Sequence, residues 1–69
     1  MEMTPVESSN IEAVGYDGDS STLQVEFKNG GTYQYFDVPE HVFEGLRDAE
    51  SVGGYLASVI KGSYRYSKV

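Results

Sequence analysis

A strict alternation of apolar and polar side chains runs along residues 23–28. Leu23, Val25 and Phe27 occupy every second position, and the residues between them are polar or charged. This two-residue period predicts a β-strand with one buried face. Phe27 is therefore expected to belong to the core, where its truncation to alanine would cost about 3–5 kcal/mol.

Two further strands are predicted beside this one. A weaker alternation covers residues 10–16, and a run of turn-forming residues follows it. Residues 32–38 alternate again, so that Tyr33 and Tyr35 share one face of their strand. Between the second and third strands, residues 29–31 are Asn-Gly-Gly, which can supply the positive φ angles of a tight hairpin. The sequence thus predicts a three-stranded antiparallel meander.

The period becomes helical after Pro39, a residue that is well placed to open a helix in its first turn. Ser51 is a suitable N-cap for a second helix, and Gly62 is a suitable residue to close it. Apolar residues recur three or four positions apart in both stretches, as Val42, Phe43, Leu46 and Ala49 and then as Tyr55, Leu56, Val59 and Ile60. The predicted fold class is α+β, with the order βββαα and a short extended C-terminal tail or edge strand.

The chain has 69 residues, which leaves room for one domain. We expect a flexible N-terminal lead-in over residues 1–7 and a single domain over residues 8–69. The first residues contain no basic stretch followed by an apolar run, so no signal peptide is predicted. No window approaches the roughly 18 apolar residues of a membrane span. The expected location is the cytoplasm, with no membrane partner.

The residues that usually carry catalysis or hold metals do not gather in the sequence. The chain has no cysteine and His41 is its only histidine, so neither a disulfide nor an ordinary zinc site can form. His41 falls in the first turn of a predicted helix, where an exposed histidine is ordinary. Asp17 and Asp19 have the spacing of a calcium loop but lack its downstream acidic ligand, so a turn is predicted there. We predict a non-catalytic protein without a cofactor or a metal.

The net charge of −6 is unevenly distributed. All 11 acidic residues lie in residues 1–50, whereas residues 51–69 contain only basic charges, Lys61, Arg65 and Lys68. Affinity for nucleic acid depends on neutralised phosphates, so this basic segment is the region where nucleic acid could dock. The plainer interpretation is a solvated terminal segment.

Six tyrosines include two Tyr-x-Tyr pairs, Tyr33/Tyr35 on the third predicted strand and Tyr64/Tyr66 in the tail. Each pair would form a flat aromatic surface, on which nucleic-acid bases can stack or a peptide can dock. The alternative for the first pair is a place in the half-buried core. The candidate binding residues are Tyr33, Tyr35, Lys61, Tyr64, Arg65, Tyr66 and Lys68.

The order of these motifs resembles the KTSC domain family over residues 6–69. The matching residues are Ser8-Ser9-x-Ile11, Gly15-Tyr16-Asp17, Leu23-x-Val25-x-Phe27, Gly31-x-Tyr33-x-Tyr35, Val38-Pro39, Ala49-x-Ser51-x-Gly53, Ile60-Lys61 and Tyr64-x-Tyr66. The family occurs at the C-terminus of some lysyl-tRNA synthetases and as small free-standing bacterial proteins. The resemblance implies a binding domain with RNA, specifically tRNA, as the candidate partner. The alternative is a protein-interaction module that uses the aromatic patch or an exposed sheet edge.

Overall fold

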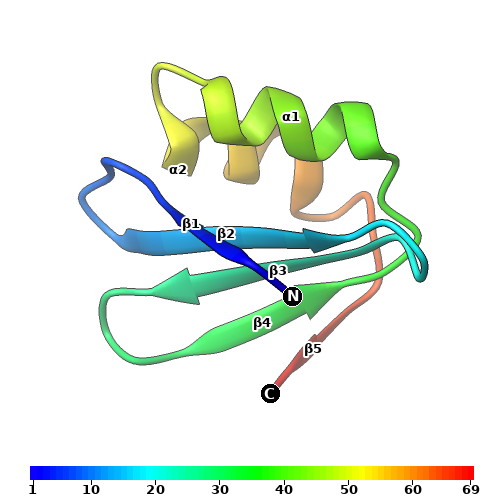
Figure 1. Ribbon diagram of the computed structural model, residues 1–69. Helices are drawn as coiled ribbons and strands as arrows, with labels where there is room; N and C mark the ends of the chain where they lie inside the picture. The colour runs from blue at the N-terminus through cyan, green and yellow to red at the C-terminus, as the bar shows by residue number, and fades with distance from the viewer.

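The computed structural model describes residues 1–69 as two layers, with a single antiparallel sheet beneath a layer of helices (Figure 1). The strands are β1 (Met3–Pro5), β2 (Ile11–Asp17), β3 (Thr22–Phe27), β4 (Thr32–Tyr35) and β5 (Tyr66–Lys68). The helices are α1 (Glu40–Asp48) and α2 (Val52–Tyr55), and the π-helix η1 (Leu56–Ile60) continues α2. Strand order follows the sequence from β1 to β5, and every neighbouring pair is antiparallel. The predicted α+β class is confirmed.

The prediction of three strands is wrong, because the sheet has five. The three predicted strands are its centre, and a three-residue strand lies at each edge. β1 lies within the expected lead-in and β5 within the expected tail. Three residues are too few for an alternation of apolar and polar side chains to be recognised, and pairing with the backbone of a neighbouring strand holds such short strands in place. Gly15 helps β1 to approach, since a Cβ there would lie 2.9 Å from the carbonyl oxygen of Glu2.

The hairpin between β3 and β4 follows the sequence prediction. Gly30 has a φ of +95°, which suits a glycine in this turn. The N–H of Phe27 donates to the carbonyl of Gly31 at 2.8 Å, and the N–H of Gly31 donates to Oδ1 of Asn29 at 3.0 Å. The turn therefore fixes how β3 and β4 pair, with Val25 opposite Tyr33.

The predicted starts of both helices and the predicted glycine after the second helix are confirmed. α1 begins directly after Pro39, and Oγ of Ser51 accepts a hydrogen bond from the N–H of Gly54 at 3.1 Å as the N-cap of α2. Gly62 follows η1 with a φ of +85°. Glycine adopts this left-handed backbone conformation without strain, which explains why it closes the helix.

The second helix departs from the predicted apolar stripe in its last turn. The N–H of Lys61 donates to the carbonyl of Leu56 at 2.8 Å, five residues back, which is the bond of a π-turn. The wider turn brings both Leu56 and Ile60 into the core. It leaves Val59 38% exposed, so the prediction that Val59 belongs to the apolar stripe is wrong.

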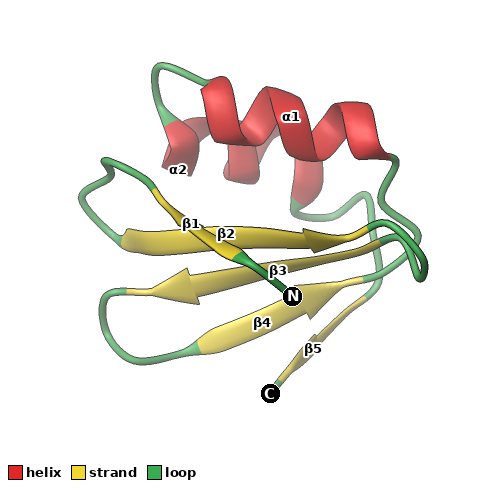
Figure 2. Ribbon diagram, viewed as in Figure 1, coloured by secondary structure: helices red, strands yellow, loops and turns green.

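The core lies between the helices and one face of the sheet (Figure 2). Its fully buried side chains include Ile11, Val14, Leu23 and Val25 from the sheet and Leu46, Leu56 and Ile60 from the helices. Phe27 packs against this cluster and is only partly buried, so the expectation of a fully buried Phe27 needs correction. The other face of the sheet is more polar, and Gln34 there donates to Gln24 at 2.9 Å.

Candidate functional site

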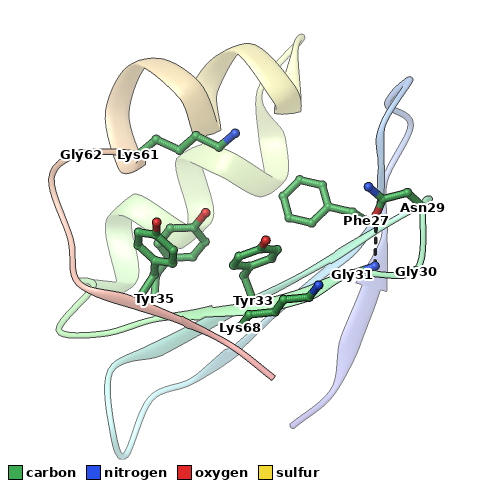
Figure 3. Close-up of a pocket in the computed structure, with 10 residues that line it drawn as sticks. Phe27, Asn29, Gly30, Gly31, Tyr33, Tyr35, Lys61, Gly62 and Lys68 are labelled. Atoms are coloured by element: carbon green, nitrogen blue, oxygen red, sulfur yellow. Dashed lines mark hydrogen bonds between the residues drawn. The ribbon is translucent and has the colours of Figure 1, made fainter.

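The largest hollow of the molecule is an open groove of about 790 Å³ at the β4–β5 side of the sheet (Figure 3). We call it the tyrosine groove. Aromatic rings, two lysines and short loops line it, namely Phe27, Asn29, Gly30, Gly31, Tyr33, Tyr35, Lys61, Gly62, Tyr66 and Lys68. The loops are the β3–β4 hairpin and the turn after η1. The groove is thus built by segments from the middle and the end of the chain.

Strand pairing explains why aromatic and basic side chains meet here. Val14 on β2 pairs with Val25, which pairs with Tyr33, which pairs with Lys68 on β5. Paired residues share a face, so this row starts in the core under the helices and ends in solvent. Both valines are buried, Tyr33 is half-buried and Lys68 is exposed. The groove is therefore the uncovered continuation of the core face.

A second row runs parallel to the first. Leu23 on β3 pairs with Tyr35, and Tyr35 pairs with Tyr66 on β5. Exposure rises sharply along it, from 3% at Tyr35 to 62% at Tyr66. Tyr35 belongs both to the core and to the groove, because its side chain is almost fully buried and still lines the groove.

The aromatic rings of the groove touch one another in a chain. Phe27 and Tyr33 meet edge to face, with ring centroids 5.6 Å apart. The centroids of Tyr66 lie 6.0 Å from Tyr33 and 5.7 Å from Tyr35. These separations are typical of favourable aromatic pairs. The rings leave no room for a base between them, so a flat ligand would lie against the surface they form.

Both lysines of the groove carry unpaired charges. Lys61 follows η1 and Lys68 lies on β5, and in Figure 3 they project from opposite sides of the Tyr33 ring. The two ion pairs of the chain, Arg47–Asp48 and Arg65–Asp37, use its arginines and leave its lysines free. No aspartate or glutamate lines the groove. An acidic protein therefore presents a groove whose lining carries two lysines and no acidic side chain.

Hydroxyl groups add hydrogen-bond donors to this surface. Tyr33, Tyr35 and Tyr66 form no side-chain hydrogen bond, whereas the hydroxyl of Tyr16 donates to the carbonyl of Val38. Burial raises the pKa of Tyr35 above its usual value, and nearby Tyr66 and Tyr33 raise it further. The Tyr35 hydroxyl is therefore protonated at neutral pH and free to donate.

Five of the seven residues predicted from the sequence line the groove: Tyr33, Tyr35, Lys61, Tyr66 and Lys68. The other two do not. Tyr64 is half-buried and packs against the core. Arg65 forms an exposed ion pair with Asp37 at 2.8 Å, and its guanidinium carbon lies 5.9 Å from the centroid of the Phe36 ring.

Sequence reasoning missed the remaining lining residues. Phe27 was expected in the core, Asn29, Gly30 and Gly31 only in a turn, and Gly62 only at a helix end. One signal could have found Phe27. The predicted hairpin places it at the end of β3 beside the start of β4, on the face that Tyr33 occupies.

The other features considered as chemistry lie elsewhere. A smaller polar hollow of about 420 Å³ is lined by Glu7 and Glu50 with serines, Asn10 and glycines, and it has no lysine or arginine. His41 is exposed in the first turn of α1. The N–H of Asp19 donates to Oδ1 of Asp17 at 3.0 Å, which confirms the predicted turn. No three histidine or acidic side chains gather as metal ligands, and no helix is long and apolar enough to cross a membrane.

Comparison with known proteins gives one consistent result. A family model described as the KTSC domain matches residues 7–64. A protein from Tsukamurella paurometabola is 46% identical over 63 residues, which cover 91% of this chain and 94% of that protein. A lysine–tRNA ligase from Nostoc sp. is 41% identical over 63 residues, and the match covers 91% of this chain but 11% of the ligase.

A solved structure gives the same result for the fold. The crystal structure of a KTSC domain protein from Yersinia pestis is 40% identical to this chain, with a TM-score of 0.95. The match covers 99% of this chain and 96% of that protein. Sequence and backbone therefore agree over nearly the whole length.

Proposed function

This chain belongs to the KTSC domain family, and on that premise we propose that it is a binding domain whose tyrosine groove holds RNA, with tRNA as the candidate partner. The resemblance inferred from the sequence motifs is confirmed by the family match. The observation that supports an RNA ligand is that aromatic rings and unpaired lysines lie together in the tyrosine groove, whose lining has no acidic side chain.

Each part of the groove suits one part of an unpaired nucleotide. Bases stack on aromatic side chains, and each stacked base contributes about 1–3 kcal/mol. Lysine ammonium groups neutralise phosphates and release the counterions bound to them. Paired bases in a duplex hide their faces, so the half-buried ring of Tyr33 and the exposed ring of Tyr66 favour single-stranded segments.

The family context supports RNA independently of the geometry. Three lysine–tRNA ligases match this chain at 36–41% identity over 63 residues. In those enzymes the matching segment stands beside machinery that handles tRNA. The proposal assigns binding rather than catalysis to this chain and places it in the cytoplasm, where tRNA is charged.

Binding measured at increasing salt tests the proposal. We expect a labelled domain to bind unstructured RNA at low salt, with amide shifts concentrated in the groove. For two phosphates on a single strand, the logarithm of affinity should fall with the logarithm of salt with a slope of about −1.4. Lys61→Ala or Lys68→Ala should each halve that slope.

Lys28→Ala is the matched control, because Lys28 is an exposed lysine outside the groove lining. Arg65→Ala is a second control, since Arg65 already pairs with Asp37. Neither control should change the slope. An absence of shifts at low salt with both tRNA and short RNA would contradict the proposal.

A second candidate is a protein-interaction module, which the free edge of β5 favours. Tyr66 and Val69 on this edge are 62% and 64% exposed, and an extended peptide can add as a further strand to such an edge. Pull-down from lysate separates the two candidates. A partner retained by the domain after nuclease treatment would favour a protein over RNA.

A further inference from the structure

The innermost part of the groove contains donors that have no acceptor. Tyr35 is 3% exposed, yet its outer end reaches the groove and its hydroxyl forms no hydrogen bond within the chain. Tyr33 and Tyr66 contribute two more hydroxyls without partners. No buried side-chain polar atom of the chain lacks a partner, so these hydroxyls reach solvent and are available to donate to a ligand in the groove.

We propose that this part of the groove is a subsite for the terminal phosphate of an RNA strand, a phosphate monoester. The hydroxyls of Tyr33, Tyr35 and Tyr66 donate to its oxygens, and Lys61 and Lys68 balance its charge. This inference rests on the proposed RNA-binding function and adds to it the chemical group that is recognised.

The polarity of the groove selects an anion. Three tyrosines and two lysines line it, and its lining contains no acidic side chain. An ammonium group only donates, so the groove offers few side-chain acceptors to a ligand. Hydrogen bonds from such donors to a charged oxygen are stronger than those between neutral groups. Burial also keeps the Tyr35 hydroxyl in its donating form.

The depth of the subsite distinguishes a monoester from an internal phosphodiester. The Tyr35 hydroxyl belongs to a buried residue, whereas Tyr66 beside it is largely exposed. A phosphodiester carries the strand on both sides and presents two free oxygens, so it would need to bend into the recess and out again. A terminal phosphate presents three free oxygens, one for each hydroxyl, and about two negative charges for the two lysines.

The rest of the groove accommodates the attached nucleoside. Its volume of about 790 Å³ exceeds what a phosphate needs. Phe27 and Tyr33, which meet edge to face beside the subsite, offer aromatic surface for the terminal base. The smaller polar hollow, with Glu7 and Glu50 and no basic residue, would repel the same ligand.

The test compares one tetranucleotide in three forms, with a 5′-phosphate, with a 3′-phosphate, and with hydroxyls at both ends. We expect at least one phosphorylated form to bind the wild-type domain about tenfold tighter or more than the unphosphorylated form. Inorganic phosphate should shift the amides of the groove and compete with that form.

Tyr35→Phe removes one hydroxyl and keeps the ring, so the fold should be retained, and a thermal melt checks this. We expect this variant to bind the phosphorylated strand about tenfold more weakly than the wild type does, and to bind the unphosphorylated strand with unchanged affinity. Tyr64→Phe is the matched control, because Tyr64 lies outside the groove lining, and it should change neither affinity. Tyr66→Phe is a second groove variant and should behave as Tyr35→Phe does.

The outcomes separate the two proposals. Equal affinity for the phosphorylated and unphosphorylated strands would overturn the terminal-phosphate subsite and leave RNA binding in place. An unchanged phosphate preference in both Tyr35→Phe and Tyr66→Phe would overturn the role of the hydroxyls. Failure of all three strands and of tRNA to bind would overturn RNA binding, and with it the assignment of the subsite to RNA.

Discussion

Tyr33 and Tyr35 each serve both the core and the groove. Both face the helices, and their pairing partners on β3 are the buried Val25 and Leu23. Towards β5 the same residues pair with Lys68 and with exposed Tyr66. A tyrosine suits this boundary because its ring is apolar and its hydroxyl can face water. The two residues therefore link folding to the candidate site.

Phe27 occupies a similar boundary, so its truncation should cost less than a core truncation. We expect Phe27→Ala to destabilise the domain by about 1–2 kcal/mol and to leave it folded, because the side chain is only partly buried. Leu23→Ala, at a residue with 0% exposure, should cost about 3 kcal/mol and leave much of the chain unfolded. Urea denaturation followed by circular dichroism measures both, and equal losses would show that Phe27 is core after all.

At the scale of elements, the π-turn of η1 connects the helical layer to the groove. Its last bond, from Lys61 to Leu56, ends the helix directly at a residue that lines the groove. Gly62 then turns the chain with a positive φ and directs it back to the sheet. The packing of the two helices thus sets the position of Lys61.

That packing depends on a close approach between Gly45 of α1 and Tyr55 of α2. A Cβ at Gly45 would lie 2.8 Å from Cζ of the Tyr55 ring, too close for ordinary contact. We expect Gly45→Ala to destabilise the domain by about 1–3 kcal/mol, although alanine favours a helix more than glycine does. Adding Tyr55→Phe removes the hydroxyl from the contact and should restore part of the loss. Thermal denaturation of the single and double variants measures this, and a stabilised Gly45→Ala would contradict it.

At the scale of the whole molecule, the helices cover one part of the sheet face and leave the other part open. Figure 1 shows both helices above β2 and β5 at the far side of the sheet. The arginines are paired with acids, so the unpaired basic charge is left to lysines, and two of the three lysines line the groove. The acidic remainder of the chain limits non-specific contact with phosphates.

Removal of β5 should abolish RNA binding while the rest of the domain stays folded. We expect a chain that ends after Arg65 to stay folded, because all three residues of β5 are exposed and every residue of the buried core precedes it. The same chain should lose RNA binding, since Tyr66 and Lys68 are gone. Removal of Val69 alone is the control and should preserve binding. Circular dichroism and an RNA titration measure the two properties, and an unfolded truncated chain would contradict the prediction.

The sequence by itself determined the features that depend on neighbouring residues. The alternation along β3 and β4, the Asn-Gly-Gly hairpin and the Ser51 cap each arise from a few adjacent positions. The ordered motifs were also sufficient to identify the family. Five site residues could be chosen because aromatic and basic residue types gather near the end of the chain and Tyr-x-Tyr repeats.

Only the tertiary structure decided which of these residues meet. β1 and β5 are three residues long, too short for an alternation to be recognised, and backbone pairing with distant segments holds them. The pairing of β5 with β4 places Lys68 beside Tyr33. Arg65, which precedes β5, lies outside the groove lining and forms an ion pair with Asp37. The π-turn exposed Val59 because it widened the helix locally. The groove exists because β5 extends the sheet past the helices, and no local pattern of residues carries that information.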